Sequence, residues 1–291
     1  MSYTTVDLTP RIGTEVRTDL ATLTSGTIAR DLRVLLEKRG VLLFRGLRIA
    51  DEDQIKFAST LGTIRLEHGL QITKITPDEA KSPIFADYTK GTYFFHIDGT
   101  YTDMPGLASI LHARAVAPAG GQTEFGNTYA MYDDLSDEEK NYLDGLEVIH
   151  SAEKIQRLAN PNPTPAQIAA WGEAVNPPKR HPMVWHHRSG RKSLILAHTI
   201  KSIIGLDQAA SDALLERLMT WAERPEYIYR HDWQVGDLLI WDNTGTMHRV
   251  VPFDLSCGRE LDRVTLLGEE PITGPFRYHD QSNEKTAKYL P

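Results

Sequence analysis

The stretch FFHIDGTY at residues 94–101 places a histidine, His96, and an aspartate, Asp98, two positions apart in an apolar, strand-like run. Side chains at positions i and i+2 of a strand project from the same face of a sheet, so we expect these two to point together. A bound metal ion or a buried ion pair would account for such a pair. The rest of the sequence has to distinguish between the two.

Composition narrows the class of protein. The chain has 291 residues, of which 41% are hydrophobic and 24% charged, and its formal net charge is −7. Nucleic-acid-binding surfaces normally need a concentrated basic footprint, so nucleic acid is not an expected partner. We expect small-molecule chemistry. Because large β structures often form one unit of this size, we interpret residues 1–291 as a single domain.

The cysteine count and the N-terminus bear on location. Cys257 is the single cysteine, so an intrachain disulfide and a cysteine-rich metal site are excluded, and a reducing cytoplasm fits. The first twenty residues lack a basic segment followed by an apolar core, and the chain has no run of about 18 apolar residues that would span a membrane. The expected location is the cytoplasm, with no membrane partner.

Periodicity predicts helices mainly at the start of the chain and in connections, and short strands elsewhere. Apolar spacing predicts a helix over 28–36 that Gly40 ends, a strand over 41–44, and a second helix from Asp51 to Gly62. Later strands are expected near 107–116, 120–127 and 238–241, and a helix over 207–223. This pattern is typical of a mainly β sandwich or barrel with flanking helices.

Two irregular segments are expected to close over a site as lids. Residues 63–95 mix glycine, proline and charge, and residues 151–182 hold six prolines around a short helix that starts at Thr164.

A third ligand should come from a distant strand, and His248 in WDNTGTMHRVV is the best candidate among the 11 histidines. Two imidazoles and one carboxylate on one side of an ion form the facial triad of non-haem Fe(II) oxygenases. Zinc would suit the same three ligands and would indicate a hydrolase instead.

Two arginines follow the third ligand, Arg259 at 248+11 and Arg263 at 248+15. Each could offer a planar fork to an oxyanion, and a keto diacid such as 2-oxoglutarate chelates iron only if something holds its far carboxylate. The alternative for both is an ordinary salt bridge, which for Arg263 could involve Asp262 or Glu269.

From about residue 10 to 270 the chain resembles the family of taurine dioxygenase and dichlorophenoxyacetate dioxygenase, which are Fe(II)/2-oxoglutarate enzymes. The motifs responsible are HID at 96–98, GGQTEF at 120–125, HPMVWHHRSGRKSL at 181–194, YRHDWQVGDLLIWDN at 229–243, and MHR with RELDRVTLLG within 247–268. The last two are closer to the herbicide-degrading branch.

The resemblance implies a double-stranded β-helix, a distorted jelly roll with helices outside, and commonly a dimer or tetramer. It implies that 2-oxoglutarate is decarboxylated with O2 to succinate and CO2 while a substrate C–H is oxidised, usually hydroxylated. It also implies residue roles: iron ligands His96, Asp98 and His248, 2-oxoglutarate ligands Thr123 and Arg259, and Arg263 for the anionic group of the primary substrate.

Other residues could contact the substrate. His68 could reach it from the irregular segment, and Tyr93 and Tyr101 could form an apolar wall, although a solvated loop histidine and ordinary core aromatics fit equally well. The substrate itself is not readable, since aryloxyalkanoates, alkyl sulfates, sulfonates and natural-product acids all fit an arginine and an apolar wall.

Three hypotheses therefore stand: an Fe(II)/2-oxoglutarate dioxygenase acting on a small organic anion, a zinc-dependent hydrolase with the same ligands, and a non-catalytic jelly roll that binds an organic acid. Oxygen uptake coupled to succinate release separates them.

Overall fold

The computed structural model describes residues 3–47, 49–82 and 88–275, and its largest element is an eight-stranded sheet. All its pairs are antiparallel except β2 with β3, and β5 pairs with β16 beside β4. The order is β1 (Thr4–Asp7), β2 (Thr14–Arg17), β3 (Val41–Phe44), β14 (Leu238–Asp242), β6 (Ala108–Ala115), β16 (Glu260–Leu266) and β4 (Ile64–Arg65), with β5 at Thr73–Ile75.

A smaller sheet faces the large one. It consists of β13 (Ile228–His231), β7 (Thr123–Asn127) and β15 (Thr246–Val250). Phe125 and Tyr229 of this sheet pack against Leu111, Leu239 and Trp241 of the large sheet in one buried cluster. The core between the two sheets is therefore apolar. Residues of both sheets also line a cavity, which is described below.

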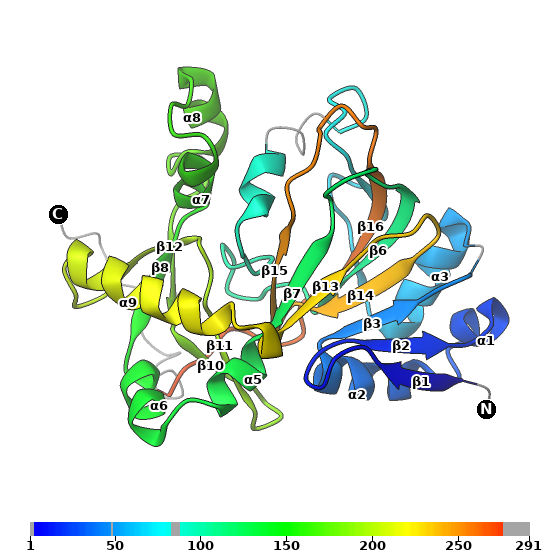
Figure 1. Cartoon of the computed structure of the whole chain (residues 1–291), viewed down its shortest axis with the longest axis horizontal. Helices are drawn as coiled ribbons and strands as arrows, with labels where there is room; N and C mark the ends of the chain where they lie inside the picture. The colour runs from blue at the N-terminus through cyan, green and yellow to red at the C-terminus, as the bar shows by residue number, and fades with distance from the viewer. Residues whose placement is uncertain (1–2, 48, 83–87, 276–291) are drawn as a thin grey trace.

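Helices cover the outer face of the large sheet (Figure 1). Strand residues alternate between the two faces, so Leu42, Phe44 and Ile240 point away from the small sheet and contact Leu32 and Phe57 of the helices. The helices are α1 (Leu20–Ser25), α2 (Ala29–Arg39) and α3 (Asp51–Leu61). The sequence predictions for α2, its glycine stop, β3 and α3 are confirmed.

A second layer, made of helices and short strands, packs behind the small sheet. Its core includes Met247 of β15, Met131 and Leu218. The elements are α5 (Thr128–Asp133), α6 (Asp137–Asp144), α9 (Gln208–Ala222), η2 (Pro225–Tyr227), the three-stranded sheet β12 (Ile200–Ile203), β8 (Glu147–His150) and β9 (Lys179–Pro182), and the pair β10 (Val184–His186) and β11 (Lys192–Leu194).

The proline-rich segment 151–182 forms an arm that projects beside the sheets (Figure 1). It contains the expected short helix, α8 (Pro165–Trp171), with a complete capping box at Thr164. The expectation was incomplete, because a further helix, α7 (Ala152–Ala159), precedes it and β9 ends it. Helix α7 contacts η1 (Thr89–Tyr93), so the two irregular segments meet.

The prediction that residues 94–101 form a strand was wrong. Only His96 pairs, in an isolated bridge with His248, and Asp98 begins a turn in which the N–H of Thr102 donates to the carbonyl of Gly99. Gly99 has φ of 87°, which turns the chain away from the sheet before a ladder can continue. In the described residues no helix has the length and apolar character needed to cross a bilayer.

Candidate metal centre

Two chain segments bring the three predicted ligands together. His96 and His248 exchange backbone hydrogen bonds of 3.0 and 2.8 Å, and His248 lies in β15, the strand that follows β14 and its turn, so the third candidate ligand comes from a separate strand as expected. Phe95 and Ile97 are buried in the core behind, so His96 and Asp98 project to the other side. Successive side chains therefore alternate between two sides, as in a strand, although only His96 of this stretch pairs with another strand.

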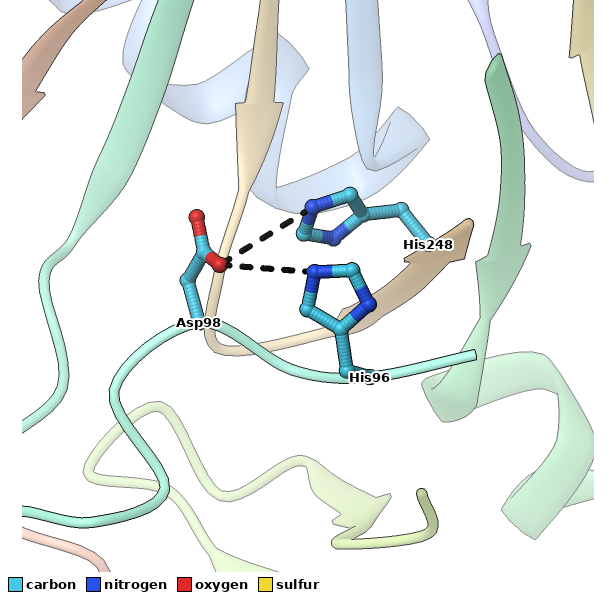
Figure 2. A group of neighbouring side chains, drawn as sticks. All are labelled: His96, Asp98 and His248. Carbon is cyan, nitrogen blue, oxygen red and sulfur yellow. Dashed lines mark ion pairs between the residues drawn. The ribbon is translucent and has the colours of Figure 1, made fainter. Parts of the chain in front are cut away.

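The ligand atoms converge on one point. The Nε2 atoms of His96 and His248 lie 3.7 and 3.9 Å from Oδ1 of Asp98, as Figure 2 shows. These distances are too long for hydrogen bonds, and the three ligand atoms all lie within 4.8 Å of one another. The arrangement fits one ion shared by three ligands better than a buried ion pair.

The protonation states also suit a metal ion, which needs neutral imidazoles and an ionised carboxylate. Burial and the adjacent His96 ring lower the pKa of His248 to about 3. Burial alone would raise the pKa of Asp98, but His248 and Arg263 outweigh it and the net shift is downward. Nδ1 of His96 lies 2.9 Å from the carbonyl oxygen of Phe94, so a proton on Nδ1 leaves the Nε2 lone pair free for a metal.

A cavity of about 90 Å³ joins the three ligands to Thr123, Arg259 and Arg263. Arg259 is 3% exposed, and the ring of Phe253 lies 5.1 Å below its guanidinium. Its Nη2 donates a long hydrogen bond of 3.4 Å to the carbonyl oxygen of Gly121, and it forms no salt bridge with any carboxylate in the described part of the chain. Burial lowers the pKa of Arg259 to about 10, so it remains a cation near neutral pH. A buried cation without a counter-ion is suited to bind an anion.

Thr123 lies at the start of β7 and is 2% exposed. Its Oγ1 accepts a hydrogen bond of 2.9 Å from the indole Nε1–H of Trp233. Because the indole is only a donor, the hydroxyl hydrogen of Thr123 can be donated to another group. Sequence reasoning missed Trp233; its place two residues after His231 in an alternating strand was the available signal.

Arg263 differs from Arg259 in its partners. Its Nη2 donates a 2.9 Å hydrogen bond to Glu67, and its Nη1 lies 3.9 Å from Oδ2 of Asp98. The alternative partners expected from the sequence were wrong, because Asp262 pairs with Arg114 and Lys74, and Glu269 pairs with Arg33.

The three remaining candidates do not line the cavity. His68 is exposed at the tip of a hairpin, with φ of 51°. Tyr93 is half-buried and its ring packs edge-on against Phe253 at 6.3 Å, next to Arg259. Tyr101 is 59% exposed and lies close enough to Asp98 and Arg263 to interact with their charges.

Comparison with known proteins shows which family and which solved structures the chain is similar to. The model of the family described as "Taurine catabolism dioxygenase TauD, TfdA family" matches residues 4–265. The chain is 32% identical over 275 residues to the alpha-ketoglutarate-dependent 2,4-dichlorophenoxyacetate dioxygenase of Cupriavidus pinatubonensis, covering 87% of this chain and 93% of that one. It is 34% identical over 271 residues to an alkylsulfatase of Acinetobacter baylyi, covering 90% of this chain and 84% of that one.

The crystal structure of AAD-2 in complex with Mn(II) and N-oxalylglycine superposes with a TM-score of 0.80 at 29% identity, covering 94% of this chain and 100% of that one.

Proposed function

We propose that this chain, which belongs to the TauD/TfdA family, hydroxylates an aliphatic C–H bond of a small organic anion. It is an Fe(II)- and 2-oxoglutarate-dependent dioxygenase that uses O2. The observation that carries the proposal is the position of Arg259, a buried cation with no carboxylate partner in the described chain, in the same cavity as His96, Asp98 and His248.

In this proposal His96, Asp98 and His248 would hold the ferrous ion through two imidazole nitrogens and one carboxylate oxygen. When bound, the ferrous ion supplies the redox chemistry that couples oxidative decarboxylation of 2-oxoglutarate to oxidation of the substrate. The turn at Gly99 and the His96–His248 bridge position the backbone of the three residues so that their ligand atoms lie close together.

Arg259 and Thr123 bind the distal carboxylate of 2-oxoglutarate. The support is their shared cavity, the missing counter-ion of Arg259, and the hydroxyl of Thr123, which Trp233 leaves available as a donor. A charged and a neutral donor together orient a carboxylate more strictly than either alone.

Arg263 faces the anionic group of the primary substrate, with Tyr93, Tyr101 and His68 as further contacts. Relatives include enzymes named for 2,4-dichlorophenoxyacetate, (S)-phenoxypropionate and sulfate esters. These names support a carboxylate, sulfonate or sulfate ester on an apolar skeleton as the substrate class. The exposed positions of His68 and Tyr101 mean that both would contact the substrate only from the surface side.

The larger-scale features of the proposal are a single domain over 1–291, folded as a distorted jelly roll, with lids at 63–95 and 151–182. Residues 1–2, 48, 83–87 and 276–291, including part of the first lid, lie outside the described residues. The contact of η1 with α7 supports paired lids, since Thr89 and Thr92 of η1 also line the cavity. A cytoplasmic homo-oligomer, dimer or tetramer, is proposed from the family resemblance.

The test is a screen for succinate release and O2 consumption with Fe(II) and 2-oxoglutarate, across phenoxyacetate, alkyl sulfates and alkyl sulfonates. We expect one class to release succinate in step with O2 uptake. Without O2, Fe(II) and 2-oxoglutarate should produce a weak visible charge-transfer band that Asp98→Ala loses and Asp103→Ala keeps, because Asp103 lies at the surface outside the cavity.

Two outcomes would overturn the proposal. Turnover without O2 that Arg259→Ala leaves unchanged would indicate the zinc hydrolase. Binding of an organic acid to metal-free protein, with no succinate released from any substrate, would indicate the non-catalytic jelly roll that binds an organic acid. The comparisons favour neither alternative.

A further inference from the structure

The two arginines of the cavity are not electrostatically equivalent. Both line the same space and are four residues apart in the sequence. Arg259 has no salt bridge with a described carboxylate, whereas Arg263 has an ion pair with Glu67 at 2.9 Å. The cofactor end of the cavity therefore keeps a full positive charge, and the substrate end has its charge offset by a resident anion.

Glu67 is held firmly in this position. One carboxylate oxygen accepts from Arg263 and the other accepts from the hydroxyl of Thr265 at 3.1 Å, with a further side-chain hydrogen bond from Thr73. Its backbone exchanges hydrogen bonds of 2.9 and 3.0 Å with Leu70 across the hairpin turn. The side chain is 18% exposed.

This environment makes displacement of Glu67 by a substrate unfavourable. An incoming anion that took Arg263 for itself would leave a mostly buried carboxylate without its cation, and removing one partner of such a pair is costly. An anion that joined the pair would instead approach Arg263 while being repelled by Glu67, which lies 2.9 Å from the same guanidinium.

We propose that Glu67 is a specificity-determining residue that offsets the charge of Arg263 and so limits the affinity of the site for anionic head groups. A neutral polar head group of the same shape then binds nearly as well as a carboxylate. This inference rests on the proposed function, because it takes the primary substrate to lie at Arg263. It concerns the charge of the substrate's head group and not the reaction.

The experiment compares phenoxyacetate with its neutral counterpart phenoxyacetamide. Isothermal titration calorimetry measures the Kd of each for the protein loaded with Mn(II) and N-oxalylglycine, a state without turnover. In wild type we expect the two Kd values to lie within about threefold, and Glu67→Gln to tighten phenoxyacetate about tenfold, which corresponds to about 1.4 kcal/mol. Phenoxyacetamide should change by less than about twofold, because the dipole of a neutral ligand interacts with the charge of Glu67 much more weakly than a full negative charge does.

Two controls separate charge from folding and from position. Glu147→Gln removes the same charge from the pair with Arg180, outside the cavity, and should leave both Kd values unchanged. Adding Arg263→Gln to Glu67→Gln should abolish the gain for phenoxyacetate.

The inference fails if Glu67→Gln leaves phenoxyacetate binding unchanged, weakens it, or changes both ligands equally, which would mean that Glu67 only positions Arg263. No detectable binding of phenoxyacetate to Glu67→Gln would also overturn it. Failure of the proposed function is seen separately, as the absence of succinate release by wild type, because the calorimetry requires no turnover.

Discussion

Trp233 shows how one donor can define the role of its neighbour. Its indole N–H occupies an acceptor position of Thr123, and the ring packs edge-on against His231 with centroids 4.5 Å apart. A threonine hydroxyl that accepts from an indole keeps its own hydrogen for another acceptor. Trp233 is thus a positioning residue for the proposed 2-oxoglutarate site.

Trp233→Phe should raise the KM for 2-oxoglutarate about three- to tenfold and change kcat less, because a neutral hydrogen bond is worth about 0.5–1.5 kcal/mol. Steady-state succinate release measures both constants. In a Thr123→Val background the substitution should add nothing further.

Trp221→Phe is the matched control, since its indole donates a 3.2 Å hydrogen bond to the carbonyl of Met131 away from the cavity. An equal rise in KM in this variant would show a general effect of losing an indole donor, and would contradict the assignment.

At the scale of elements, the turn that enters β7 is tied to the segment that carries Phe253. The N–H of Gly121 donates to Val251 and the N–H of Val251 donates to Gln122, at 2.9 and 2.8 Å. Gly120 has φ of 72°, and a Cβ there would lie 2.1 Å from the carbonyl oxygen of Pro252. Glycine at 120 is what lets the turn approach the chain that supports Arg259.

Gly120→Ala should therefore lower the free energy of unfolding by about 3 kcal/mol, from positive-φ strain plus the clash with Pro252. It should also raise the KM for 2-oxoglutarate, because the shifted backbone carries Phe253. Chemical denaturation and steady-state kinetics measure the two effects.

Gly190→Ala provides the comparison, with φ of 85° and no atom within 4 Å of the added Cβ. It should lose only about 1–2 kcal/mol, the strain of a left-handed residue. Equal losses in the two variants would show that the contact with Pro252 has no energetic consequence.

For the whole molecule, buried histidines make folding sensitive to acid. His150 is 3% exposed, its Nδ1 lies 2.7 Å from the hydroxyl of Thr199, and burial together with His181 lowers its pKa to about 3. In the unfolded chain His150 has the ordinary histidine pKa of about 6.5, so it binds a proton more readily there than in the folded protein. The stability that neutral His150 contributes is complete above pH 6.5 and is lost as the pH falls towards 3.

We expect the metal-free protein to lose stability between pH 6 and pH 4, and His150→Gln to reduce that slope by about 1.4 kcal/mol per pH unit, the value for one proton. His248 should add to the loss in both proteins, while Asp242 should oppose it, because burial raises its pKa to about 6. Urea unfolding at several pH values gives both slopes. Identical slopes would mean that His150 does not titrate with unfolding.

Much of the fold could be read from the sequence because its signals are local. The apolar spacing and glycine stop of α2, the start of α3 at Asp51 and the capping box at Thr164 each lie within a few residues of what they specify. Helix α7 was missed because prolines and asparagines around it suggested irregular chain. The three candidate ligands could also be named from the sequence, because histidine and aspartate are metal-binding residue types and their order along the chain matches the family motifs.

The sequence by itself determined many of the helices and strands and singled out three candidate ligands, because periodicity, caps and the donor chemistry of a residue type can be recognised without tertiary contacts. Only the tertiary structure decided that FFHIDGTY turns instead of continuing as a strand, and which partners the site residues have. Arg263 meets Glu67 across 196 positions and Trp233 meets Thr123 across 110. Such contacts depend on how strands from distant parts of the chain register in the sheets, and no local pattern records that register.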